Sequence, residues 1–427
     1  MRARPSPGPA RAALAALAAA LLAAPGGAAG RELWRDGDRG ASLRTSLKSS
    51  LVVADPPDDP SLFPEGTSAA SYWRLRLELD VRPSTWAAVA IAYEQRLWTG
   101  AATDALGAGA VVDAAPPPWR LEPLDGRIAS GPSFAWRHEL DRASVALHLG
   151  RAEATVGRQA IGWGRGVLFG AVDLFAPFSP LEADREWRRG VDAVRAEVRL
   201  GDRTSVEGVA ALGESPDASI FAGRLRGDLG KADTELVGGW RARDVFGGVT
   251  SSAAVGDAEL HGELALFRAP HPLPSGGAWG DGRLAPKAVA GGSYRFAVGR
   301  GLAALAEYHY SGFGARSPGE VVALLAGSRE FGERYLRGDT QILGRHAVAL
   351  LATLELTNEL AGQALALLSP RDGSGVLSPS LTYTLSDAAS VQATLYVPWG
   401  AEPEGLALRS DYGWTPLSAF VQLRLYD

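Results

Sequence analysis

Alternation of apolar and charged side chains with a period of two is the feature that most constrains how this chain can fold. The segment 72–81 reads Y-W-R-L-R-L-E-L-D-V, with Trp, Leu and Val at the odd positions and Arg, Glu and Asp at most of the even ones. On a helix these charges would be spread around the circumference, whereas on a strand they form one stripe. The same alternation recurs in 191–200, 259–267 and 417–425. The pattern predicts an all-β protein whose strands have two chemically different faces.

The turns between these segments alternate between two sizes. Tight turns rich in Gly, Asp and Asn occur at eight places, namely 82–84, 150–153, 201–203, 230–233, 256–258, 299–301, 357–359 and 386–389. Several connections between them are much longer, among them 99–130, 162–190 and 314–340. Barrels of the bacterial outer membrane have tight periplasmic turns and longer outer loops, and both chain ends on the periplasmic side require an even strand number. We therefore predict a single antiparallel transmembrane β-barrel of about 18 strands.

Two positions disturb this count. The apolar period slips near Arg142, which requires either a bulge in one long strand or a turn over 139–143. Arg158 falls on the apolar parity of Val156, which predicts a bulge at Gly157. A barrel of about 16 strands is the alternative that these positions leave open.

The first 29 residues predict a secretory signal peptide. Arg2, Arg4 and Arg11 precede the apolar run 12–24, and small residues at 27–29 suit cleavage before Gly30. The domain prediction is a signal peptide over 1–29 and a barrel over 30–427.

The chain has no cysteine, which excludes disulfides, Cys-ligated metals and thiol catalysis. A net charge of −5 argues against nucleic acid as a partner.

The charged stripes predict a water-filled interior. Arginines and carboxylates occur on them in about equal number, and a dry core could not hold so many ions, because burial costs several kcal/mol for each one. The alternative is a soluble secreted β-protein, in which the leucine-rich stripes would pack inside. A barrel of about 18 strands is too wide for side chains to fill, which favours the wet lumen.

The segment 156–195 has the most specific content. The strand end Gly157-Arg158-Gln159, followed by Trp163-Gly164, resembles the "GRQ…WG" element of Gram-negative outer-membrane channels, including general porins and alginate-export-like barrels. The resemblance implies that the loop after this strand folds into the lumen and narrows it, with Arg158 pointing inward at the constriction. The candidate constriction loop is 162–190, which carries basic and acidic residues in equal number. Opposed charges across a narrow wet passage can orient a polar solute.

The candidate pore-lining and constriction residues combine that loop with the inward stripes of the strands. They are Arg74, Arg76, Glu78, Arg158, Arg165, Asp173, Asp184, Arg185, Arg188, Arg189, Arg195, Glu197, Arg199, Arg224 and Arg226.

Passive diffusion of small polar solutes across the outer membrane is the function that the sequence favours. The alternative is an exporter or surface-binding barrel for an extracellular polysaccharide, which the alginate-export resemblance implies. An exporter of an anionic polymer should show excess arginine, whereas the charged stripes carry arginines and carboxylates in about equal number.

Catalytic and metal-binding motifs are not found, so we expect no enzyme and no cofactor. Expected partners are outer-membrane lipid, the barrel-assembly machinery and the solute; the sequence does not decide the oligomeric state.

Overall fold

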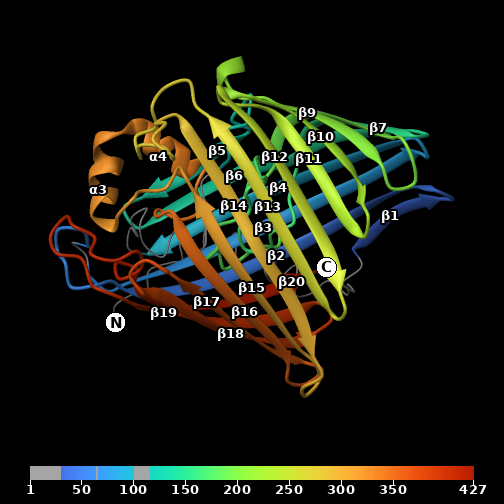
Figure 1. Cartoon of the computed structure of the whole chain (residues 1–427). Helices are drawn as coiled ribbons and strands as arrows, with labels where there is room; N and C mark the ends of the chain where they lie inside the picture. Colours follow the sequence, from blue (N-terminus) through green and yellow to red (C-terminus); the bar gives the residue numbers. More distant parts are fainter. Residues whose placement is uncertain (1–29, 64–65, 101–115) are drawn as a thin grey trace, which may run out of the picture.

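Eighteen antiparallel strands close into one barrel in the computed structural model, which describes residues 30–63, 66–100 and 116–427 (Figure 1). The predicted signal peptide, 1–29, lies outside the described residues. In chain order, the strands of the wall are β2 (Arg39–Asp55), β3 (Ser68–Ser84), β4 (Ala87–Gly100), β6 (Phe134–Leu149), β7 (Ala152–Gln159), β8 (Val191–Arg199), β9 (Ser205–Ala211), β10 (Ile220–Leu229), β11 (Ala232–Arg241), β12 (Asp244–Val255), β13 (Ala258–Arg268), β14 (Leu284–Phe296), β15 (Leu302–Ser311), β16 (His346–Glu355), β17 (Leu360–Leu368), β18 (Gly375–Ser386), β19 (Ala389–Trp399) and β20 (Leu417–Tyr426).

The first and last strands of the wall close the barrel. One edge of β2 pairs with β3, and the other pairs with β20 from Ser46↔Tyr426 to Asp55↔Leu417. Each remaining strand of the wall pairs with the next one along the chain. Closure gives the backbone hydrogen-bonding groups of these edges a partner, which crossing a membrane requires. The predicted 18-strand barrel is confirmed, and the alternative of 16 strands is wrong.

The irregularity near Arg142 is a bulge rather than a turn. Pairing between β4 and β6 passes from Ala92↔Arg142 to Tyr93↔Leu140, which leaves Asp141 as the extra residue. As a result, β6 is one continuous strand. The bulge predicted at Gly157 is wrong, since β7 keeps its register with both neighbours; instead, Gly157 has a φ of +113° that disfavours any residue with a Cβ.

Two short strands supplement the wall. β1 (Arg31–Asp36) forms a hairpin with the start of β2. β5 (Asp125–Gly131) pairs with Phe134–Glu139, the first part of β6, whereas β7 pairs with the later part of the same edge. The segment containing β5 therefore completes the wall where β7 and β8 are short.

The two rims of the barrel differ as predicted. Eight tight turns connect wall strands at one rim, where β2 begins and β20 ends. Longer connections occupy the other rim, and one of them carries α3 (Pro318–Gly327) and α4 (Arg329–Leu336), seen at the left of Figure 1. The exception is the β11–β12 connection, which has only Ala242 and Arg243, both with positive φ. Neither helix is long and apolar enough to cross a membrane, nor is any other within the described residues.

The two faces of the wall have the chemistry that the alternation predicts. In β13, Leu260, Leu264 and Leu266 are 50%, 54% and 42% exposed on the outer face. His261 and Glu263 alternate with them and are buried inside. The leucines of β13 therefore face away from the interior, and Leu236, Leu350 and Leu381 of other wall strands are exposed in the same way. This exposure contradicts the soluble β-protein with a leucine core.

Candidate functional site: the barrel interior

The connection between β7 and β8, residues 160–190, occupies the barrel interior and contacts the opposite wall; we call it the inward connection. Glu263 of β13 accepts hydrogen bonds from the backbone amides of Gly166 at 2.7 Å and Ala171 at 2.6 Å, and also from those of Arg165 and Val172. The β7–β8 connection thereby reaches across to a strand five positions further along the wall.

Glu307 of β15 holds the neighbouring part of the inward connection in the same way. It accepts from the amides of Val167, Leu168 and Phe169 at 2.6, 2.9 and 3.1 Å, and lies 2.9 Å from His261 Nε2. Buried amides need acceptors, and this stretch has no strand partner to supply them. Two wall carboxylates replace that partner, with hydrogen bonds strengthened by their charge.

Apolar side chains pack the inward connection against the wall. Trp163, Phe169, Leu174 and Phe175 are buried. The Trp163 ring meets Phe175 edge-on at 5.1 Å, and its Nε1 donates to Glu207 of β9 at 3.0 Å. Hydrophobic burial and satisfied polar atoms thus act together to hold this half of the connection.

A second anchor lies at the opposite side, on β2. The Lys48 Nζ is 2.7 Å from Asp184 and 2.6 Å from Glu186, and 3.8 Å from the centre of the Trp187 ring. Burial alone would raise the pKa of Asp184, but Lys48 and Arg74 outweigh burial and hold that pKa below its ordinary value. The carboxylate is therefore ionised, and the anchor is a buried ion pair.

Most charged residues of the inward connection form ion pairs or hydrogen bonds that fix it in place. Arg188 pairs with Asp173 at 2.6 Å and donates to the carbonyl of Ala176. Arg185 donates to the carbonyls of Leu168 and Ser179. Arg165 pairs with Asp233 of β11 at 2.5 Å, and Arg189 lies 3.6 Å from Glu139 of β6.

Ion pairs also dominate the inward face of β3, β4 and β6. Arg74 contacts Glu94 at 2.7 Å, and Arg76 contacts both Glu94 and Asp141. Glu78 completes the set, at 2.6 Å from Arg76. The bulge in β6 turns Asp141 toward this cluster, where it also accepts from the amide of Gly190 at 2.9 Å. The bulge at Asp141 thus places a carboxylate where it accepts a hydrogen bond from the last residue of the inward connection.

The inward-facing charged side chains of β8 to β11 form a second cluster of ion pairs. Glu207 accepts from Arg195 at 3.1 Å and from Arg224 at 2.5 Å, while Arg226 pairs with Asp233 at 2.9 Å. Glu197 lies 3.6 Å from Arg195. Arg199 is exposed at the tight-turn rim, away from the inward connection. Charges of both signs therefore share the inner surface, several of them partly open to water.

Arg158 has a different place from the one that the resemblance implies. It shares the parity of outward-facing Val156, is 1% exposed, and pairs with Asp192 of β8 at 2.7 Å. Its guanidinium also donates to the carbonyls of Leu140 and Glu122. Arg158 therefore braces the wall against the segment before β5 instead of facing the lumen.

Sequence reasoning missed several residues of the site. Lys48 was not among the candidates, although 43–54 alternates like the other strands and places Lys48 on the inward parity. Glu263 and Glu307 are recognisable as inward charges, but nothing local shows that they bind a distant connection. Within the described residues, no group of three or more His, Asp or Glu could hold a metal ion.

Comparison with known proteins gives fold relatives only. No known sequence family matches the chain, and no curated protein does. Among solved structures, OccAB4 of Acinetobacter baumannii is 8% identical with a TM-score of 0.54, covering 92% of this chain and 100% of that one. OccAB1 of the same organism has 9% identity, a TM-score of 0.54 and coverage of 94% and 98%. OccK11 (OpdR) of Pseudomonas aeruginosa is 10% identical with a TM-score of 0.52, covering 90% of this chain and 95% of that one. These neighbours are outer-membrane porins, and this chain has their fold.

Proposed function

We propose that the protein is an outer-membrane channel for the passive diffusion of small polar solutes. The observation that carries this proposal is the closed 18-strand wall with leucine on its outer face and ion pairs on its inner face. A wall of that size leaves an aqueous bore, and its outer face suits lipid. The neighbours of like fold support an outer-membrane location and a channel rather than an enzyme. Insertion would use the barrel-assembly machinery.

The inward connection is the proposed constriction. It spans the interior from Lys48 on β2 to Glu307 on β15, so a solute must pass beside it. The partly exposed charges at its edges, such as Arg188, Arg195 and Arg226, would orient polar groups of the solute. Paired charges of both signs predict weak selectivity between cations and anions. A polysaccharide exporter would need surplus arginine, whereas Arg76, Arg195 and Arg224 are paired with carboxylates.

Single-channel recording in planar lipid bilayers tests this proposal. We expect discrete conductance steps from the purified protein, and a conductance about twofold or more larger when 163–187 is replaced by a short Gly/Ser turn. A matched control shortens 402–407 in another connection of the same rim and should leave the conductance nearly unchanged. A silent bilayer with folded protein, or an unchanged conductance after removal of 163–187, would contradict the proposal.

A further inference from the structure

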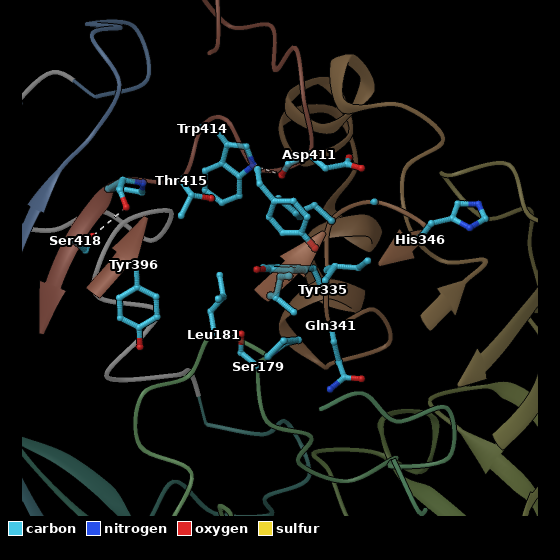
Figure 2. A pocket seen from close by; sticks show the side chains of 17 residues that line it. Ser179, Leu181, Tyr335, Gln341, His346, Tyr396, Asp411, Trp414, Thr415 and Ser418 are labelled. Atoms are coloured by element: carbon cyan, nitrogen blue, oxygen red, sulfur yellow. Dashed lines mark hydrogen bonds between the residues drawn. The ribbon is translucent and has the colours of Figure 1, made fainter. Parts of the chain in front are cut away.

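A pocket with about 910 Å³ of empty space, part of it open to solvent, lies at the longer-connection rim (Figure 2). Three connections meet there: Ser179–Leu181 of the inward connection, 341–344 after α4, and 411–416 before β20. Leu367 of β17 and Tyr396 of β19 complete the side facing the wall. The pocket is thus built where the proposed constriction meets the outer mouth.

Aromatic rings make up much of its lining. Tyr335, Tyr396, Tyr412 and Trp414 all line the pocket. Trp414 is fixed by a hydrogen bond from its Nε1 to the carbonyl of Asp411 at 2.8 Å. Tyr412 is buried, and its hydroxyl has no hydrogen-bond partner within the part of the chain that the structure describes. A buried hydroxyl without a partner is costly, so a ligand that satisfies it gains affinity.

Among the described residues, the lining includes one carboxylate and no lysine or arginine. Asp411 accepts from the Ser369 hydroxyl at 2.5 Å, but forms no ion pair with any described residue. Elsewhere in the interior, Asp184, Glu207 and Asp141 each lie against a basic side chain. Asp411 therefore gives the pocket negative character, and His346 is the one basic side chain among the described lining residues that could offset it.

Two other polar side chains of the lining, Gln341 and Ser418, already have hydrogen-bond partners within the protein. The Gln341 amide donates to the carbonyl of Phe178 at 2.8 Å, while its oxygen accepts from the amide of Gly170 at 2.7 Å. Ser418 donates to the carbonyl of Pro416. An anion would meet the Asp411 carboxylate at close range, so an anionic ligand does not suit this lining.

We propose that this pocket binds an organic ammonium cation that carries an aromatic or alkyl group. The cationic group would lie beside the Asp411 carboxylate and the faces of Tyr412 and Trp414, since cations are attracted to both. The apolar body would pack on Leu181, Leu367 and Tyr396. The inference rests on the proposed function, and names a class of solute held at the channel mouth.

Isothermal titration calorimetry of the full-length, detergent-purified protein tests the inference, with benzylammonium, benzyl alcohol and benzoate as probes. We expect the cation to bind at least about tenfold more tightly than the alcohol, and benzoate not to bind. Asp411→Asn keeps an oxygen for Ser369 and should weaken cation binding about tenfold. Trp414→Leu should weaken it several-fold.

Glu404→Gln is the matched control, because it removes the same charge from the same connection at a side chain that is 82% exposed and does not line the pocket. It should leave affinity unchanged, and thermal unfolding should show that every variant is folded. Equal affinity for benzoate, or an unaltered affinity in folded Asp411→Asn, would overturn the inference. Conductance without cation binding would refute only the pocket; cation binding without conductance would refute only the channel.

Discussion

Inside this barrel, single carboxylates accept the backbone hydrogen bonds that a neighbouring strand would otherwise accept. Glu263 and Glu307 each satisfy at least three backbone amides of the inward connection. The period of two predicts that both face inward, since each lies on a stripe opposite leucine or tyrosine. It does not predict their partners, because those amides lie about 90 to 140 residues away in sequence.

Glu263→Gln should loosen the inward connection. The glutamine NH₂ group would face amide donors, and the loss of the charge should cost about 2 kcal/mol of unfolding free energy. Single-channel recording should also show a noisier current, because the connection moves more freely. Glu259→Gln is the control, since Glu259 is on the same stripe but exposed near the tight-turn rim. Equal stability and current noise in the two variants would refute this role for Glu263.

The titration of Asp173 should appear in the pH dependence of stability. Burial raises the pKa of Asp173 above its ordinary 3.8, although Arg188 opposes that rise. The folded protein then holds this proton more tightly than the unfolded chain, so the stabilisation is complete below pH 3.8 and is lost as pH rises through the raised pKa.

Thermal unfolding between about pH 4 and pH 7 measures this effect. Relative to Asp173→Asn, the wild-type protein should lose stability as the pH rises through that window. Asp257→Asn, at an exposed tight turn, should show no such trend relative to wild type. A constant difference between wild type and Asp173→Asn would mean that Asp173 does not titrate there.

At the scale of elements, the two ends of the inward connection have separate anchors. Lys48→Met removes the closer basic partner of buried Asp184 and leaves Arg74 at 3.8 Å, so it should cost about 3 kcal/mol. Arg44→Gln on the same stripe breaks an exposed pair with Asp80 and should cost about 1 kcal/mol or less. Chemical unfolding of the two variants gives the comparison. Equal costs would show that the Lys48 pair contributes no more than a surface ion pair.

Some elements follow from local sequence and others do not. α3 begins at Pro318, and proline suits the first turn of a helix because its missing N–H needs no partner there. β5 was not predicted as a strand, because its seven residues form a strand only against the first part of β6. α4 also depends on distant contacts, since Arg334 pairs with Asp244 of β12 at 2.6 Å and with Asp339. Short elements are thus stabilised by partners that periodicity cannot identify.

At the scale of the whole molecule, the leucine-rich outer face should behave as a lipid-contacting surface. Leu264→Arg, near the middle of β13, should destabilise the barrel by about 2–4 kcal/mol in lipid. Leu229→Arg, at the tight-turn end of β10, should cost about 1 kcal/mol or less, since it lies near the interface. Urea-dependent unfolding from lipid vesicles measures both. Similar costs at the two depths would contradict the membrane-spanning assignment.

The barrel was predictable because its architecture follows from features that can be read within short stretches of the sequence. Alternation identifies the strands, turn size separates the rims, and eight tight turns imply 18 strands. The interior was less predictable, since it depends on which distant stripe the inward connection meets. Arg158 shows the difference: parity with Val156 places it outward, whereas the resemblance implies a lumen position, and the contacts agree with parity.

The dependence of the inward connection on Glu263 and Glu307 limits how such a protein can evolve. A transplanted copy of 160–190 would lose its shape in a barrel that lacks those two acceptors. Conversely, a new path for this connection requires coordinated change at positions about a hundred residues apart. The inward connection and the wall that holds it are therefore expected to be inherited together, and homologues should exchange them as one unit.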